Sequence, residues 1–447
     1  MSSAFQFAPV KLVYGGEALG FQAGRTVLAP LVLPGERAEV EEVRRQKGVV
    51  RARPLRIIEP SPQRIEPFCK YFGHCGGCQY QHMEYPAQVT AKVEILRETL
   101  RRLGQVKWEG HIRAHSGPPR NYRNQAQLKV AKSPSGTPLL GFFEAESNRL
   151  VAIDTCPILS PRLNALLSVL QGEPWISALA KVREIELLAD DRDEKVMLTL
   201  AGEWDAQEAG TLAEKLLTEL AGVSTVAVAK GDGGVRSYGE QHLMYRVREF
   251  AYRVSPTAFF QSARFLLDEF VAAVVAPSLS PADETASAAA MPIHERTGGV
   301  ALDLFAGVGL FTLPLAKRFD QVIAVEAHPQ AAADLAANAA SVPGKGIRVI
   351  ASTAFDYLRR CAQRDPDLVI MDPPRAGVGV STLKFLLNLR PKHLHYVSCS
   401  PPTLARDLAF LLRHGYRLDS VEMFDFFPQT YHIESLVRLS RIGCEPA

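Results

Sequence analysis

Residues 368–375 are LVIMDPPR, and residues 395–401 are HYVSCSP. In each stretch a short motif follows an apolar run. Apolar runs of this length, bounded by breakers and separated by a helical segment, are typical of buried parallel strands. Each motif would lie just past the carboxyl end of its strand, where open α/β sheets build their sites. We therefore expect the acid Asp372 and the thiol Cys399 to face one crevice. A buried core cysteine is equally consistent with the residue type of Cys399, but the paired proline-rich loops favour a functional thiol.

The chain has 447 residues, a net charge of +3 and seven cysteines. This length is too great for one hydrophobic core, so we expect two or three domains. The nearly neutral charge does not itself indicate nucleic-acid binding, but it is compatible with local basic patches. We find neither an apolar run of about 18 residues nor a leader, and therefore expect no transmembrane span, no signal peptide and no membrane contact. The odd number of cysteines favours a reducing, cytoplasmic compartment, and we also expect a monomer. Three of the cysteines fall within ten residues, which argues against a disulfide framework.

Residues 1–66 predict a small β domain. Strand-like stretches at 26–32, 37–43 and 48–58 are separated by glycine and proline turns. Small barrels of the oligonucleotide-binding kind bind single-stranded nucleic acid through basic faces. Solvated edge strands, which Lys and Arg protect, are an equal alternative. The basic residues of this segment are Arg44, Arg45, Lys47, Arg51, Arg53 and Arg56.

A cysteine-rich loop follows, in which residues 69–80 are CKYFGHCGGCQY. The glycines Gly76 and Gly77 allow the backbone to wrap closely around a metal. Three thiolates need a fourth ligand, and Cys156, which is followed by proline, is the best candidate. His74 and His82 are weaker candidates. Four thiolates suit either zinc or an iron–sulfur cluster, and the spacing does not separate them. The predicted ligands are Cys69, Cys75, Cys78 and Cys156.

The middle of the chain mixes strand-like and helical stretches. Apolar residues three or four apart predict a helix over 86–103, and Asp205 and Glu208 are spaced like a capping pair for a helix over 205–220. The polar run 121–125 suits RNA contacts, although a polar strand edge is equally consistent. Residues 259–261, Phe-Phe-Gln, either line a cofactor pocket or belong to the core. The composition of residues 276–299 indicates a flexible insertion.

From residue 299 strands and helices alternate. Residues 300–309 are VALDLFAGVG, a strand and a turn that dinucleotide enzymes and methyltransferases share. The next strand ends in Glu326, and an acid at this distance can bind both hydroxyls of a ribose. Nicotinamide enzymes usually have a further glycine where this chain has Thr312. The pattern therefore favours S-adenosylmethionine over NAD.

The chemistry of the second half points to uracil. Enzymes that methylate exocyclic amines usually end the 372–375 loop with an aromatic residue, but here it is Arg375. Carbon-5 of uracil is a poor nucleophile, and a thiolate that adds to carbon-6 activates it. Cys399 is placed for this attack, and we expect the charge of Arg375 to lower its pKa. Glu434 is the candidate base that removes the carbon-5 proton, with His432 weaker; a surface acid is the alternative for Glu434.

Together these motifs resemble the RNA uracil-C5 methyltransferases, in the branch that carries a TRAM domain and an iron–sulfur cluster. The resemblance spans nearly the whole chain: residues 14–20 and 33–36, the cysteine loop, and 259–261, 303–309, 372–375, 398–401, 406–407 and 432–434. It implies that Cys399 is the nucleophile and Glu434 the base, and that the four cysteines hold a 4Fe–4S cluster. It further implies that Gln261, Phe305, Glu326 and Asp372 contact either the cofactor or the uracil ring. Ala263, Leu310 and Ser400 stand where the family often has asparagine.

The expected fold is multi-domain. We predict a TRAM-like, OB-like RNA-binding barrel over 1–66, a central α+β domain with the cysteine cluster over 67–255, and an α/β Rossmann-like methyltransferase domain over 256–447. Helix 86–103 can pack on the last of these. The expected activity is S-adenosylmethionine-dependent formation of 5-methyluridine in RNA, with 23S rRNA as first substrate and tRNA as second. An RNA-binding module with a degenerate catalytic half and a metal-dependent redox protein are the alternatives.

Overall fold

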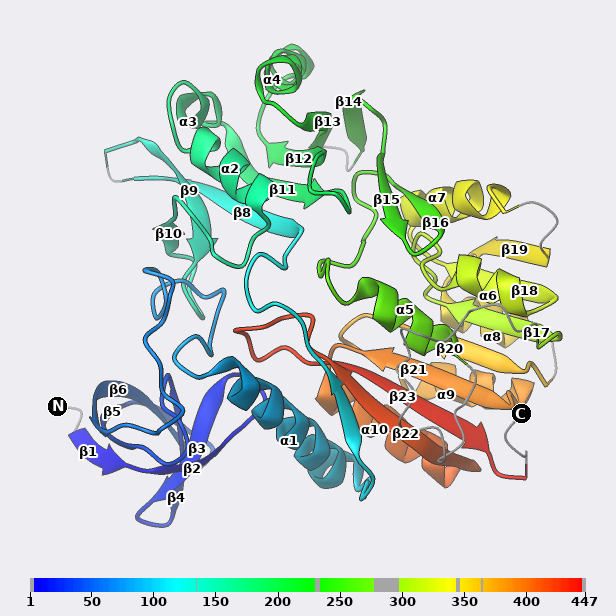
Figure 1. Cartoon of the computed structure of the whole chain (residues 1–447), viewed down its shortest axis with the longest axis horizontal. Coiled ribbons are helices and arrows are strands. Elements are labelled where there is room, and N and C mark those ends of the chain that lie inside the picture. Colours follow the sequence, from blue (N-terminus) through cyan, green and yellow to red (C-terminus); the bar gives the residue numbers. More distant parts are fainter. Residues whose placement is uncertain are drawn as a thin grey trace.

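The computed structural model describes residues 4–133, 135–229, 234–276, 297–342, 346–362 and 365–443. Three large sheets and one hairpin organise the chain (Figure 1). Residues 277–296 of the predicted insertion lie outside the described residues. Among the helices that are described, none combines the length and apolar character that crossing a bilayer requires.

The N-terminal sheet has six strands in the order β1-β5-β6-β4-β3-β2, and contact between β1 and β3 shows that it curls. The strands are β1 (Ala4–Phe7), β2 (Pro9–Leu12), β3 (Glu17–Gln22), β4 (Arg25–Pro30), β5 (Arg37–Gln46) and β6 (Val49–Glu59). The three predicted strands are present as β4, β5 and β6, with ends shifted by at most three residues. Four of the six basic residues form ion pairs with glutamates of the same sheet: Arg45 with Glu42, Arg51 with Glu17, Arg53 with Glu41 and Arg56 with Glu39. This balance of charge favours solvated side chains over nucleic-acid contacts for those four, although β5 and β6 are interior strands and not edges of the sheet.

The central unit is a seven-stranded sheet in the order β10-β9-β8-β11-β12-β13-β14. Its strands are β8 (Gln125–Lys132), β9 (Pro138–Phe143), β10 (Leu150–Ala152), β11 (Val182–Ala189), β12 (Val196–Gly202), β13 (Val223–Ala229) and β14 (Val235–Gly239). Its helices are α2 (Pro161–Leu170), α3 (Trp175–Ala178) and α4 (Ala206–Glu219). Asp205 and Glu208 form the predicted capping box of α4. Within the polar run, the Tyr122 hydroxyl donates to the Pro428 carbonyl and the Asn124 amide to the Tyr245 hydroxyl, each at 2.9 Å, so both side chains are structural.

The C-terminal unit is an eight-stranded sheet in the order β19-β18-β17-β20-β21-β23-β22-β7. Its strands are β7 (Ile112–His115), β17 (Val300–Leu304), β18 (Gln321–Glu326), β19 (Gly346–Ala351), β20 (Leu368–Met371), β21 (His393–Ser398), β22 (Tyr416–Phe424) and β23 (Glu434–Arg441). The helices are α5 (Leu267–Val275), α6 (Thr312–Arg318), α7 (Pro329–Ala340), α8 (Ala354–Arg360), α9 (Val380–Leu389) and α10 (Pro401–Arg413), and the hairpin β15 (Leu243–Val247) and β16 (Phe250–Val254) lies beside α7. Strand order reverses between β17 and β20, the switch point at which such sheets bind ligands.

Helix α1 (Tyr85–Gly104) packs against α10 and connects the N-terminal sheet to the C-terminal one (Figure 1). Leu96 and Leu100, which belong to the apolar pattern that predicted this helix, are buried, and so are the polar Gln88 and Lys92. A Cβ at Gly104 would lie 2.5 Å from the carbonyl oxygen of Ala405, so the two helices touch through their backbones. One continuous core joins the first sheet, α1 and the last sheet. The domain boundaries remain a prediction. Strand β7, from the predicted central domain, pairs with β22 of the predicted methyltransferase domain, so the boundary expected at residue 255 does not separate all contacts.

Candidate active site

The end of β21 and the start of β23 bring the predicted thiol and acid together. The two strands are antiparallel, and their register ends with Ser398 opposite Ser435. Cys399 and Glu434 therefore occupy the next position across the strands. The Ser435 hydroxyl donates to the Ser398 carbonyl at 3.0 Å, which ties the two chains directly beneath this pair. Cys399 is half-buried and Glu434 is buried, at 4% exposure.

Asp372 is a second acid in this site, beside Glu434. It follows β20, which runs between β17 and β21. Burial raises the pKa of Asp372 to about 7. Burial and then the neighbouring Asp372 raise the pKa of Glu434 well above its usual range, while the charge of Arg375 opposes the shift. Once it is ionised, a carboxyl with a raised pKa binds a proton more strongly than an ordinary glutamate, which suits a general base.

The expected lowering of the Cys399 pKa is wrong for the free chain. Burial, and after it the carboxyls of Glu434 and Asp372, raises the pKa of this thiol to about 11. Arg375 does act in the predicted direction, but its effect is outweighed. The prediction failed because it counted one cation and neither the burial nor the two acids. The thiol is therefore held protonated before substrate binds.

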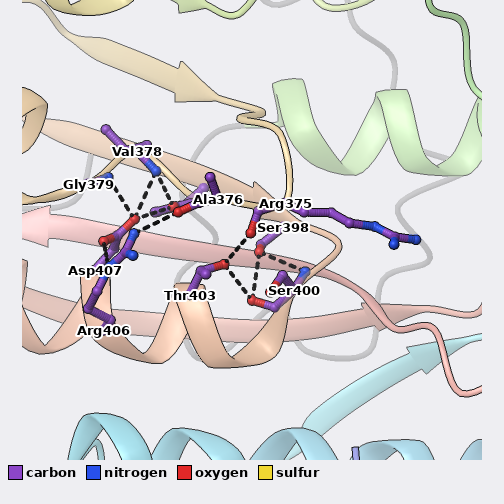
Figure 2. Close-up of polar contacts among 10 residues, drawn as sticks. Arg375, Ala376, Val378, Gly379, Ser398, Ser400, Thr403, Arg406 and Asp407 are labelled. Atoms are coloured by element: carbon purple, nitrogen blue, oxygen red, sulfur yellow. Dashed lines mark hydrogen bonds and ion pairs between the residues drawn. The ribbon is translucent and has the colours of Figure 1, made fainter. Parts of the chain in front are cut away.

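Asp407 on α10 holds the loop that carries Arg375. Its carboxylate Oδ2 accepts hydrogen bonds from the N–H groups of Val378 (2.9 Å) and Gly379 (3.2 Å) and from the Tyr396 hydroxyl (2.7 Å). The Thr403 hydroxyl on the same helix donates to the Arg375 carbonyl at 3.0 Å. Figure 2 shows the Arg375 side chain extending away from this cluster of contacts. The loop is fixed through its backbone, which leaves the guanidinium of Arg375 free of the Asp407 contacts.

The turns after β17 and β18 form the other part of the site. Glu326 accepts hydrogen bonds from the N–H groups of Gly307 (2.8 Å) and His328 (2.6 Å). Phe305 has φ +66°, a left-handed conformation that is unusual for a bulky residue and marks functional turns. Thr312 donates to the buried Asp303 at 2.5 Å, and burial raises the pKa of Asp303 to about 7. Thr312, which stands where nicotinamide enzymes usually have a glycine, thus begins α6 and holds Asp303 below the turn.

The two aromatic residues before Gln261 differ in burial. Phe260 is buried and packs on Tyr245 with ring centroids 4.6 Å apart, whereas Phe259 is 67% exposed. Gln261 is buried. The core alternative therefore holds for Phe260 and not for Phe259. Ala263, one of the departures from the family pattern, pairs with Arg123 in an isolated β-bridge that attaches this segment to the central unit.

The four predicted cysteine ligands line one cavity of about 260 Å³, together with residues such as Tyr71, Phe143 and Arg123. His74 and His82 are absent from the residues that line it. The four thiols are Cys69, Cys75, Cys78 and Cys156, and all are free. Within the described ranges, no three His, Cys, Asp or Glu side chains converge tightly enough to hold a metal ion.

The wrapping of Gly76 and Gly77 around a metal stays a prediction, but Gly76 has a second close neighbour. A Cβ at Gly76 would lie 2.8 Å from the backbone nitrogen of Ala145, so Gly76 lets the cysteine loop lie against the turn between β9 and β10. The Gly76 N–H donates to the Phe143 carbonyl at 2.9 Å in the same contact. The Gly77 N–H points at the Cys75 sulfur, 3.4 Å away.

Two aromatic residues of the site were missed from the sequence. Tyr14, in the turn between β2 and β3, places its hydroxyl 3.4 Å from the Cys399 carbonyl oxygen. Tyr431 packs edge-on against it, with ring centroids 5.5 Å apart. No periodicity connects residue 14 to residue 399, and the only signal was the Gly15-Gly16 turn. His432, next to Tyr431, has its pKa lowered to about 4 by burial and the charge of Arg375, so it is neutral.

A largely parallel sheet with an acid at the end of β18, a left-handed turn after β17 and a thiol and an acid beyond β21 defines a Rossmann-like α/β protein. The model of the tRNA (Uracil-5-)-methyltransferase family matches residues 84–442, and the chain belongs to this family. The prediction of an RNA uracil-C5 methyltransferase is confirmed.

Relatives extend the match over nearly the full length. An uncharacterized RNA methyltransferase of Aquifex aeolicus is 32% identical, over 96% of each chain. The 23S rRNA (uracil(1939)-C(5))-methyltransferase RlmD of Alkalilimnicola ehrlichii is 32% identical, over 98% of this chain and 96% of its own. The crystal structure of Pyrococcus abyssi tRNA (uracil-54, C5)-methyltransferase with S-adenosyl-L-homocysteine superimposes with a TM-score of 0.73 at 23% identity, over 97% of this chain and all of that one. This structural likeness supports the fold.

Proposed function

We propose that this enzyme transfers a methyl group from S-adenosylmethionine to carbon-5 of a uridine in 23S rRNA, with tRNA as the second candidate substrate. The observation that carries the chemistry is the register of β21 and β23, whose last pair, Ser398 with Ser435, leaves Cys399 and Glu434 at the next position. The ribosomal choice is supported by the RlmD relatives, which match this chain end to end.

In the proposed mechanism the Cys399 thiol first loses its proton to solvent. The thiolate then bonds to carbon-6 of uracil, and the ring electrons move to carbon-5 and the neighbouring carbonyl. S-adenosylmethionine, when bound, supplies the electrophilic methyl group. Glu434 then removes the proton from carbon-5, the carbon-5/carbon-6 double bond forms again, and Cys399 leaves as the thiolate. Arg375 supplies the positive charge that favours the thiolate.

The proposed cofactor contacts fit the groups that the turns present. Glu326 stands at the end of β18, where an acid binds ribose hydroxyls. Oδ1 of the buried Asp303, near the end of β17, has no hydrogen-bond partner among the described residues. It is therefore an acceptor that a bound ligand can use. We assign Gln261, Phe305 and Asp372 to the cofactor or the uracil on the family resemblance.

We also propose that the cysteine cavity holds a 4Fe–4S cluster rather than zinc. Four thiols around one cavity are the donor set that such clusters use. The choice of the cluster over zinc rests on the family resemblance of the cysteine loop. Methyl transfer needs no electron, so the cluster would be structural or would orient RNA.

The remaining proposals concern the RNA-binding surface, the oligomeric state and the cellular compartment. RNA would bind the first sheet in the manner of a TRAM barrel, using basic residues outside the four ion pairs, and the enzyme would act as a cytoplasmic monomer. The support is the resemblance of residues 14–20 and 33–36 to that domain, together with the curl of the sheet.

RNA that carries 5-fluorouridine tests the proposed function. Fluorine cannot leave as a cation, so the reaction should stop with Cys399 bonded to carbon-6. We expect a denaturation-resistant protein–RNA band that requires S-adenosylmethionine, disappears in Cys399→Ala and persists in the control Cys361→Ala. Sequencing of the trapped RNA would identify the uridine. RNA binding without a band from either ribosomal or transfer RNA would overturn the proposal and support a binding module.

A further inference from the structure

We propose that Tyr14, supplied by the N-terminal sheet, is a positioning residue of the active site, and that its hydroxyl orients the main chain of Cys399. The inference rests on the proposed function, because it assigns Cys399 its role. It gives the first sheet a part in the chemistry that is separate from any contact with RNA.

A tight turn brings Tyr14 to the site. The Val13 N–H donates to the Glu17 carbonyl at 2.9 Å and closes the turn between β2 and β3. Gly16 has φ +90°, and a Cβ there would lie 2.9 Å from Gln79 Cγ and 3.4 Å from Tyr431 Cδ1. Glycine at this position therefore lets the turn lie against both the cysteine loop and the loop before β23.

The surface that receives this turn is itself fixed. The N–H groups of Gln79 and Tyr80 both donate to the Gln429 carbonyl at 2.9 Å. Gln429 has φ +70° and lies three residues before His432 in the loop that leads to Glu434. The Tyr14 ring packs at 90° to the Tyr431 ring, which holds the phenol in one orientation.

The Tyr14 hydroxyl then reaches the backbone of the nucleophile. Its oxygen is 3.4 Å from the Cys399 carbonyl oxygen, a long contact of the kind that tightens when an apo site binds substrate. Burial raises the pKa of Tyr14 to about 12, so the phenol is a donor at neutral pH. The Cys399 peptide lies between the end of β21 and the start of α10. Holding its carbonyl fixes the peptide plane and with it the direction of the thiol.

Tyr14→Phe removes this donor and keeps the ring against Tyr431. With 5-fluorouridine RNA under single-turnover conditions, we expect adduct formation to slow about five- to tenfold, the effect of one hydrogen bond, while the Kd for RNA changes less than twofold. Tyr238→Phe, on β14 of the central sheet, is the matched control and should match the unaltered enzyme. An unchanged adduct rate in Tyr14→Phe, or a loss explained by weaker RNA binding, would overturn the inference. Absence of an adduct in the unaltered enzyme would instead refute the proposed function.

A second pair of variants tests the position of the turn. Gly16→Ala strains a left-handed residue and also pushes a Cβ into Gln79, whereas Gly48→Ala strains a similar residue (φ +81°) with no atom within 4 Å of the added Cβ. We expect Gly16→Ala to slow adduct formation and Gly48→Ala to leave its rate unchanged. The two variants should have the same thermal stability. Equal adduct rates in the two variants would show that the position of the turn does not matter.

Discussion

Lys92 on α1 and Asp425, just beyond β22, form an ion pair of 2.6 Å in which neither side chain is exposed to solvent. Lys92 also donates to the Phe427 carbonyl at 2.9 Å, so a single buried ammonium holds the loop that leads to Tyr431 and Glu434. Removing one member of a buried pair leaves an uncompensated charge.

Lys92→Met should therefore lower the free energy of unfolding by about 3–5 kcal/mol, measured by urea denaturation. The double variant Lys92→Met/Asp425→Leu should recover much of that loss, because it leaves no unpaired charge. Lys181→Met, which breaks an exposed pair with Glu208, is the control and should cost at most about 1 kcal/mol. Equal losses in the two lysine variants would contradict this account.

Glu434→Gln should stop the reaction after methyl transfer. Without the base, the carbon-5 proton stays and Cys399 cannot leave, so a covalent complex should accumulate with ordinary uridine RNA. Turnover should fall by about 10²- to 10⁴-fold. Denaturing gels and release of S-adenosylhomocysteine would measure the two effects, with Glu240→Gln as a distant control. Full turnover in Glu434→Gln would remove this residue from the mechanism.

The reactivity of Cys399 in the free enzyme should depend steeply on pH. Its pKa is raised to about 11, so the thiolate fraction, and with it the rate of alkylation, should rise with pH up to that value. Glu434→Gln removes a negative charge that disfavours the thiolate and should move the curve to lower pH. Arg375→Ala should move it to higher pH. Mass spectrometry of the Cys399 peptide after iodoacetamide treatment would follow the rate, and a shift in the opposite direction in either variant would refute the assigned electrostatics.

Glu326→Gln should weaken S-adenosylmethionine binding by about tenfold or more, because the carboxylate would lose charge-assisted hydrogen bonds to the ribose hydroxyls. Isothermal titration calorimetry without RNA isolates this step. Glu203→Gln, in an exposed part of the central unit, should bind the cofactor normally. If Glu326→Gln also binds normally, Glu326 serves only to accept the hydrogen bonds from Gly307 and His328.

Purification without oxygen should yield protein that contains iron and sulfide at about four atoms of each per chain if the cluster assignment is correct. Cys156→Ser should lower both, whereas Cys361→Ser, outside the cavity, should not. Zinc without sulfide in the unaltered protein would overturn the cluster proposal and leave the methyltransferase proposal intact.

Local patterns predicted the parts of this fold that depend on neighbouring residues. The apolar runs before Asp372 and Cys399 are β20 and β21, and the capping pair of Asp205 and Glu208 is formed. Hydrophobic burial and helix capping act within a few residues, so the sequence alone carries these signals.

Features that depend on distant partners were not predictable. Strand β7 is four residues long, and only its pairing with β22 makes it part of the sheet. Nothing in the local pattern marks Lys92 as buried, because its partner Asp425 lies 333 residues away. Tyr14 and Cys399 are separated by 385 residues. The sign of the Cys399 pKa shift was missed for the same reason, since burial and two acids from other strands decide it.

Strand β23 lies between β21 and β22, although the ribosome makes it after every other strand of that sheet. Until residues 434–441 have been synthesised, β21 is an open edge, and the β22–β7 pair has no sheet to join. Open edges of this kind promote misfolding in a nascent chain. The same late strand begins with Glu434, the proposed base. The step that closes the sheet during synthesis is thus also the step that would switch the enzyme on, so an unfinished chain could hold RNA without completing the modification.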